Sequence, residues 1–297
     1  MNIVKVKKEK NYFIFWLLII PVLLVRGICS LYPIINTFYS SFFQINKIMH
    51  INKFIGIRNF IDIFSDIKVL ETLHFTAFFT LVSIALHTII GVALALLLNK
   101  EFKGRKLLRT VVLIPWALPL IVAGIAAAWG FNDSYGFVND IIRRLATGFH
   151  FDWLSSSMGA QIAVILADVW KDTPFYAIMI LAGLQSIPTE IYEAAHIDGA
   201  SSIKVFWSIT IPNIAPLMVI LTIFFSLWRL TQFDLIYAMT KGGPGNSTSL
   251  LSYRVYVEAF NNQNFGYASS ISVLLCLIMI AIAIIGFAIN RKIDFES

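Results

Sequence analysis

Three charged side chains and one aromatic ring lie within a long apolar stretch, Ala160–Leu184, where charge is costly. They are Asp168, Lys171, Asp172 and Phe175. On an α-helix these positions project within one arc of about 100°. Ionisable groups inside membrane-spanning helices usually face a cavity or one another. Two interpretations therefore stay open: a polar substrate surface bordered by an aromatic ring, or an internal ion pair between Asp168 and Lys171.

A second polar group lies in the apolar stretch Ile214–Ile236. Trp228, Arg229 and Gln232 share one side of a helix there. An aromatic face with amide and guanidinium donors suits a hydroxyl-rich ligand such as a sugar, and a guanidinium suits a carboxylate or phosphate. These residues predict substrate contacts, with an anionic ligand permitted. The alternative is that Arg229 is a structural partner for Asp234 or for the acids of the preceding stretch.

The segment that joins these two stretches has the features of a helix–turn–helix elbow. Thr189 can cap a short helix, and Glu193 suits its positive N-terminal end. Gly199 can end that helix, and Pro212 can open the next span. Small residues in the short helix would let the surface of a partner approach the backbone. The alternative is an ordinary amphipathic connector. The candidate docking residues are Glu193, Ala194, Ala195, Asp198 and Gly199.

Motifs for catalysis and metal binding are absent from the sequence. The five histidines form no His-Glu-x-x-His pair, and there is no Gly-x-Ser-Gly and no phosphate-binding Gly-x-x-x-x-Gly-Lys-Ser/Thr. Cys29 and Cys276 show no metal-ligand spacing. We therefore expect no catalytic residues, no metal and no cofactor in this chain.

Long apolar helices must position these residues. Of 297 residues, 58% are hydrophobic and 13% are charged, and the mean hydropathy is +0.77. Soluble domains have about 45–50% apolar and about 25% charged residues. A soluble enzyme, a disordered chain and a disulfide scaffold are therefore excluded. A span needs roughly 20 apolar residues, so we predict an all-α polytopic membrane protein with six spans: Tyr12–Phe43, Thr72–Leu98, Leu107–Trp129, Ala160–Leu184, Ile214–Ile236 and Tyr267–Asn290.

The distribution of basic residues predicts the orientation. The net charge is +6, from 23 basic and 17 acidic residues. Four segments of 57 residues in total hold 12 Lys and Arg, whereas three segments of 87 residues hold 8. Basic residues concentrate in cytoplasmic loops, so both termini are predicted to be cytoplasmic and no nucleic acid is implied. The inner segments are 1–11, 99–110, 185–211 and 291–297, and the outer loops are 44–70, 131–157 and 235–267. Trp116, near a predicted span end, is interpreted as an interface anchor.

The elbow also resembles a known family. Its spacing of Glu-Ala-Ala, three residues, Gly, nine residues and Ile-x-Ile-Pro, from Glu193 to Pro212, is similar to the signature loop of permease subunits in binding-protein-dependent ABC importers. Further stretches resemble the carbohydrate branch, of the maltose or glycerol-3-phosphate type: Phe54–Phe60, Arg105–Arg109, Gly183–Pro188, Phe233–Tyr237 and Thr240–Pro244.

The resemblance implies one transmembrane permease domain over residues 1–297, with the type I importer fold and a cytoplasmic coupling loop at 185–211. In that family the elbow docks on an ATPase subunit, so Glu193, Ala194, Ala195, Asp198 and Gly199 would be the coupling residues. The implied partners are a second permease subunit, two ATP-binding subunits that hold ATP and Mg, an extracytoplasmic solute-binding protein and membrane lipid. The chain would be a multi-pass protein of the bacterial cytoplasmic membrane, forming half of the pathway of a sugar importer, with an oligosaccharide as the expected substrate.

Two function classes remain as alternatives. A secondary transporter or channel that works without an ATPase would also have polar residues in broken spans. An intramembrane enzyme would need motifs that the sequence lacks. The signature loop favours the importer over both.

Overall fold

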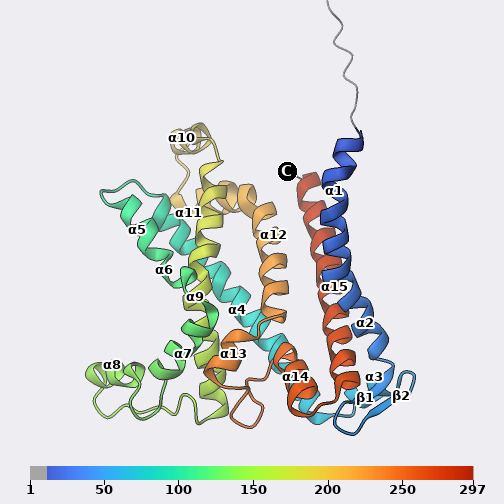
Figure 1. Ribbon diagram of the computed structural model, residues 1–297. Helices are drawn as coiled ribbons and strands as arrows, with labels where there is room; N and C mark the ends of the chain where they lie inside the picture. Colours follow the sequence, from blue (N-terminus) through green and yellow to red (C-terminus); the bar gives the residue numbers. More distant parts are fainter. Residues whose placement is uncertain (1–11, 297) are drawn as a thin grey trace, which may run out of the picture.

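The structure is a computed structural model that describes residues 12–296, with side chains described from 15 to 292. The predicted inner segment 1–11, with its four lysines, lies outside the described residues. The described part is almost entirely helical, as the composition predicts, and its one sheet is a short hairpin (Figure 1).

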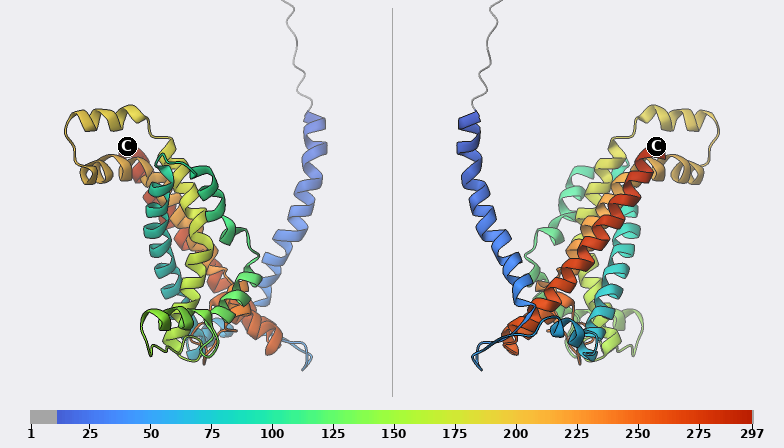
Figure 2. Two further views of the ribbon diagram at one scale, coloured as in Figure 1. Left: turned by 90° about the vertical axis from the view of Figure 1, so that its left-hand side faces the viewer. Right: turned by 90° about the vertical axis from the view of Figure 1, so that its right-hand side faces the viewer.

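The first span forms an arm beside the rest of the chain. It comprises α1 (Tyr12–Arg26), a π-helical turn (Gly27–Leu31) and α2 (Tyr32–Ser40), and α2 packs on α15 (Phe265–Glu296). No residue of its apolar window is buried within the chain. The views in Figure 2 show α1 diverging from the other helices. A helix that is apolar on all sides and unburied here must be covered by lipid or by another subunit.

The hairpin and a short helix follow the arm. β1 (Phe43–Asn46) pairs antiparallel with β2 (Ile51–Phe54), with Phe43 opposite Phe54. The buried Asn59 of α3 (Arg58–Ile63) donates hydrogen bonds to the backbone carbonyls of Ser41 and Phe43. These bonds hold the end of the arm to the hairpin.

Three helices form the centre of the fold. α4 (Ile67–Asn99) and α9 (Ser157–Gln185) share the most extensive helix–helix contact, and α12 (Ile211–Leu230) packs on both. Gly91 of α4 permits this approach, because a Cβ there would lie 2.6 Å from Cδ1 of the fully buried Tyr176 ring. α12 continues α11 (Ser202–Val205) through a π-helical turn (Phe206–Thr210), so one helix runs from Ser202 to Leu230.

The third predicted span, Leu107–Trp129, is not one unbroken helix. α5 (Arg105–Val112) and α6 (Ile114–Ala117) are separated from α7 (Leu120–Gly130) by a bend of 89°. Leu118 is extended, with φ −70° and ψ 138°. Pro119 causes this, because proline disfavours helical geometry in the preceding residue and has no N–H to donate.

The fifth predicted span, Ile214–Ile236, extends beyond the end of the observed helix. The helix stops at Leu230, and α13 (Asp234–Met239) packs instead on α7, where a Cβ on Gly124 would lie 2.8 Å from the Ala238 Cβ. Within residues 12–296, four helices are long and apolar enough to cross a membrane, or up to five if the bent pair counts as one span. α9 has the necessary length, with 29 residues, but it contains Asp168, Lys171 and Asp172.

The loops divide between two ends of the molecule as the charge distribution predicts. Figure 1 shows the start of α1, the C-terminus, α5 and α10 (Thr189–Ile197) at one end. The hairpin, α3, α8 (Phe137–Leu145) and α14 (Leu251–Tyr256) lie at the other end. We call the first the elbow end and the second the hairpin end.

The contact between Gly91 and Tyr176 gives a test of the central packing. Gly91→Ala should destabilise the protein by about 1–3 kcal/mol, because an added methyl group overpacks a buried contact. The measurement is the thermal denaturation midpoint of the purified protein. Gly27→Ala is the matched control, since a Cβ there meets nothing within 4 Å. Equal midpoints for the two variants would contradict the close packing of α4 on α9.

Candidate functional site

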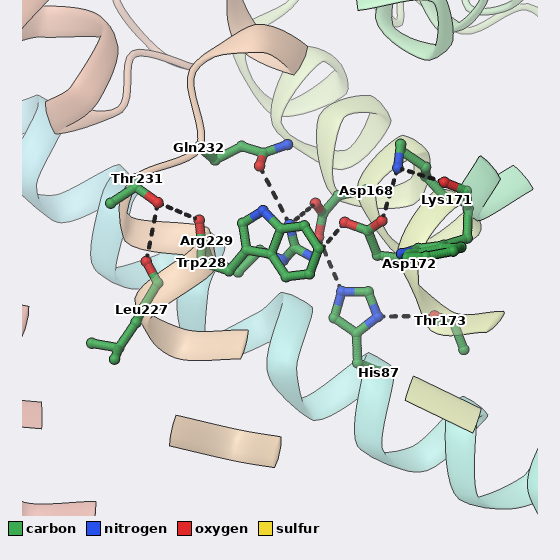
Figure 3. A network of polar contacts seen from close by, with 11 residues as sticks. His87, Asp168, Lys171, Asp172, Thr173, Leu227, Trp228, Arg229, Thr231 and Gln232 are labelled. Atoms are coloured by element: carbon green, nitrogen blue, oxygen red, sulfur yellow. Dashed lines mark hydrogen bonds and ion pairs between the residues drawn. The ribbon is translucent and has the colours of Figure 1, made fainter. Parts of the chain in front are cut away.

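A charge cluster joins α4, α9 and α12 at the centre of the fold. It comprises His87, Asp168, Lys171, Asp172 and Arg229 (Figure 3). Arg229 of α12 lies between the two acids of α9: its Nη1 is 2.9 Å from Asp168 Oδ1, and its Nη2 is 2.6 Å from Asp172 Oδ2. All three side chains are fully buried. Arg229 is therefore the structural partner of the α9 acids, which was one of the two sequence interpretations.

His87 contributes the third helix to the charge cluster. Its Nε2 lies 3.2 Å from Asp168 Oδ2, and its Nδ1 lies 2.9 Å from the Thr173 hydroxyl. A carboxylate only accepts hydrogen bonds, so Nε2 is the nitrogen that carries a proton toward Asp168. The sequence analysis did not single out His87 as a site residue. The available signal was its position within the apolar stretch Thr72–Leu98.

Lys171 pairs with Asp172 and not with Asp168, which one interpretation of the sequence predicted. Its Nζ donates to Asp172 Oδ1 at 3.1 Å and to the backbone carbonyl of Trp116 at 3.3 Å. Trp116 lies in the last turn of α6, just before the break at Pro119, where carbonyl groups lose their helical donors. The Lys171 ammonium therefore gives the Trp116 carbonyl a hydrogen-bond donor. Its positive charge also interacts favourably with the negative C-terminal end of α6.

The charge cluster is neutral as a whole if His87 is uncharged, because two carboxylates face one guanidinium and one ammonium. This balance matters because a buried charge without a partner is costly. Two donors at this cluster, Arg229 Nε and Gln232 Nε2, nevertheless find no acceptor among the described residues. Gln232 lies beside the cluster, with its Oε1 3.4 Å from Arg229 Nη1.

An aromatic wall lies next to the charge cluster. Trp116 stacks on Phe175 with ring centroids 4.9 Å apart, and Phe175 meets Trp228 edge to face at 6.5 Å. Phe224 extends the row, 5.3 Å from Trp228. Trp116 and Phe224 are exposed by 37% and 49%. Trp116 lies at the helix break beside the cluster, and its interpretation as an interface anchor stays a prediction.

The structure places the seven predicted pathway residues in two groups. Lys171, Asp168, Asp172, Arg229 and Gln232 are buried and contact one another, whereas Phe175 and Trp228 are partly exposed in the aromatic wall. The charged members therefore stabilise the helix packing, and the aromatic members are the part of this set that is partly exposed.

The elbow has the predicted shape with two differences. α10 ends at Ile197, and Gly199 has φ +72°, a conformation that favours glycine. Pro188, not Thr189, is the N-cap residue of α10, and Pro212 lies inside a helix that has already begun at Ser202. The Tyr192 hydroxyl lies 3.2 Å from the Thr210 hydroxyl and connects α10 to the next helix.

Four of the five predicted docking residues are accessible. Glu193, Ala194, Asp198 and Gly199 are exposed, whereas Ala195 is buried against its own chain. Ala195 therefore supports the packing of α10, and the surface open to a partner is formed by the other four. Among the described residues, no group of His, Cys, Asp and Glu could hold a metal ion.

Comparisons with known proteins agree with this architecture. Residues 87–295 match the family described as binding-protein-dependent transport system inner membrane components. The chain is 36% identical to the trehalose/maltose transport system permease protein MalF of Thermococcus litoralis, over 98% of each chain. It is 37% identical to the sulfoquinovosyl glycerol transport system permease protein SmoG of Agrobacterium fabrum, over 94% of this chain and 90% of that one.

A solved structure shares the fold. One chain in the crystal structure of a bacterial alginate ABC transporter, in complex with an alginate pentasaccharide-bound periplasmic protein, superposes with a TM-score of 0.82. The match covers 96% of each chain at 19% identity.

The charge balance of the cluster predicts a large effect of removing Arg229. Arg229→Gln should destabilise the protein by about 3–5 kcal/mol, because it leaves buried carboxylates without their partner. The measurement is the denaturation midpoint of the purified protein. Arg144→Gln, which breaks an exposed pair with Asp140 on α8, is the control and should change stability by about 0–1 kcal/mol.

A charge-balanced variant separates electrostatics from packing. Adding Asp168→Asn to Arg229→Gln leaves one acid facing Lys171, and part of the stability should return. A double variant no more stable than Arg229→Gln would refute the neutral-cluster explanation.

Proposed function

We propose the following function on the premise that this chain belongs to the family of binding-protein-dependent transport system inner membrane components. It is a membrane-spanning permease subunit of an ABC importer in the cytoplasmic membrane, and ATP is hydrolysed by a separate subunit. Family membership sets aside a secondary transporter or channel. The chain itself would need no cofactor, since ATP and Mg would bind to the partner ATPase.

The substrate class that we propose is a sugar, with an oligosaccharide as the expected size. Relatives are named for trehalose and maltose and for sulfoquinovosyl glycerol. The aromatic wall supports this, because Trp116 and Phe224 are exposed by 37% and 49%, and exposed aromatic rings suit sugar rings. Lys171 and Arg229 are already paired with Asp168 and Asp172. The pairing argues for a neutral sugar rather than an anionic one.

For the topology we propose six spans within one permease domain, residues 1–297, with both termini cytoplasmic. α9 would be the fourth span, its charges neutralised by α12, and the bent pair α5–α7 would be the third. The basic segment 99–110, whose helix α5 lies at the elbow end, supports this orientation. The loops of the hairpin end, 44–70, 131–157 and 235–267, would then receive the solute-binding protein.

The elbow is the proposed contact with the ATPase. Its exposed residues Glu193, Ala194, Asp198 and Gly199 project from the elbow end, and Figure 2 shows α10 standing clear of the helix bundle. The assembly would contain two ATP-binding subunits and a second permease subunit that completes the pathway. The hydroxyl pair of Tyr192 and Thr210 provides a direct route from α10 to α12, and so to the charge cluster.

Gly199→Ala tests the coupling role. The residue would have to adopt φ near +72°, which costs an L-residue about 1–2 kcal/mol. The turn should therefore shift and abolish uptake and substrate-stimulated ATPase activity, while the amount of inserted protein stays at the wild-type level. Glu193→Ala should act in the same direction.

Gly148→Ala is the matched control, because Gly148 has φ +84°, has free space around it and lies at the hairpin end. The coupling role is refuted if Gly199→Ala and Glu193→Ala both keep wild-type stimulation of ATPase activity in the purified assembly.

Trp116→Ala tests the aromatic wall as a sugar contact. It removes a ring but keeps the carbonyl that Lys171 contacts, so the helix break should be retained. Since an aromatic contact contributes roughly 0.5–1.5 kcal/mol, the KM for uptake should rise about three- to tenfold. Trp170→Ala is the control, because Trp170 is half-exposed on α9. An unchanged KM in Trp116→Ala would remove this residue from the substrate pathway.

A further inference from the structure

A cavity of about 720 Å³ lies at the elbow end, where α4, α9, α10 and α11 meet. Its base is formed by buried side chains, among them Leu184, Val205 and Thr210. The sugar pathway does not use it, because the aromatic wall and the charge cluster share none of its lining residues.

The wall of the cavity is apolar and its outer edge is aromatic. Leu96 of α4 and Phe206 line the side, and Trp207 and Ile203 stand at the opening with 64% and 74% of their surfaces exposed. Tryptophan is enriched at membrane–water interfaces, where its ring lies at the level of the lipid headgroups. These exposed apolar groups indicate contact with lipid rather than with water.

The rim of the cavity is cationic. Lys100 is the residue after α4, so it marks the depth at which an apolar helix of 33 residues leaves the hydrocarbon. Lys100 and His196 both line the cavity and are exposed, and their side chains have no hydrogen bond or ion pair among the described residues. The loop after Lys100 holds Glu101 and Lys103, and α5 begins with Arg105 and Lys106, so the basic residues outnumber the single acid. Basic pockets between membrane helices on the cytoplasmic side bind anionic headgroups.

We propose that this cavity binds an anionic phospholipid of the inner leaflet. The headgroup phosphate lies at Lys100 and His196, and one acyl chain follows Leu96, Phe206 and Trp207 into the cavity. The proposal goes beyond sugar transport, but it rests on the orientation that places the elbow end in the cytoplasm. The lipid would touch α4 and α10 together, so its presence would stabilise the position of the elbow relative to the bundle.

Lipid fits the cavity better than the other possible occupants. A free phosphate would use the cationic rim and leave the apolar wall exposed to water. A segment of the ATPase would suit the apolar wall, but the unpaired Lys100 at the end of an apolar span matches the charge and depth of a headgroup.

The test measures lipid retention by the assembled transporter, purified from nanodiscs of phosphatidylcholine with phosphatidylglycerol, by native mass spectrometry. Lys100→Ala should lower retained phosphatidylglycerol about fivefold, since each basic residue near a membrane surface contributes about 1 kcal/mol. Lys103→Ala is the control, because it removes one charge from the same loop but does not line the cavity. Ser202→Trp, which fills the opening and removes no charge, should lower retention to the same extent.

Three results would overturn the proposal. One is equal retention by Lys100→Ala, Ser202→Trp and Lys103→Ala. Another is displacement of the lipid by inorganic phosphate alone, which would show an anion site without an acyl-chain site. The third combines two observations. A photoactivatable phosphatidylglycerol fails to label α4 or α11, and a crosslinker at Asn99 captures the ATPase. Retention is measured without transport, so failure of the sugar proposal would leave this test intact.

Discussion

The fold depends on the burial of charge between α4, α9 and α12. A guanidinium and two carboxylates placed in an apolar interior are tolerated only when they contact one another with good geometry. Arg229 meets Asp168 and Asp172 at 2.9 and 2.6 Å, and His87 occupies the remaining oxygen of Asp168. Separating α9 from α12 would leave charges unpaired, and moving α4 away would remove the hydrogen bond between His87 and Asp168. The three helices therefore have one strongly preferred arrangement, and the other elements pack around it.

The charge cluster also fixes the position of the break between α6 and α7. Lys171 connects Asp172 of the cluster to the carbonyl of Trp116, so the break at Pro119 is held at a fixed place beside the aromatic wall. The elbow is connected from the opposite direction through the Tyr192 and Thr210 hydroxyls. The aromatic wall and the docking surface thus both contact the α9–α12 pair. A rotation of these two helices would move the wall and the elbow together.

Local signals in the sequence predicted much of this, including Arg229 as one candidate partner of the α9 acids, but the pairings of His87 and of the Trp116 carbonyl were beyond them. Helical spacing correctly placed Asp168, Lys171 and Asp172 on one side of α9, and Gly199 correctly marked the turn of the elbow. Those two pairings could not be predicted, because His87 is 81 residues from Asp168 and the Trp116 carbonyl is 55 residues from Lys171. The break at Pro119 had a local signal, but an apolar pattern continues on both sides of it. The hydrogen bond from Lys171 to the Trp116 carbonyl and the packing of α13 on α7 add to the effect of Pro119 in favouring the bent form.

The charge cluster also has a consequence for the order of synthesis. α9 leaves the ribosome before α12, and Arg229 follows Asp172 by 57 residues. Until then α9 presents three charges, each costing about 2.5–3.5 kcal/mol at the centre of an inserting helix. The apolar arm α1–α2 needs no partner to enter the bilayer. The acids of α9, in contrast, are paired with Arg229 only after α12 has been synthesised. With α9 as the proposed fourth span, we therefore expect α9 and α12 to enter the lipid together.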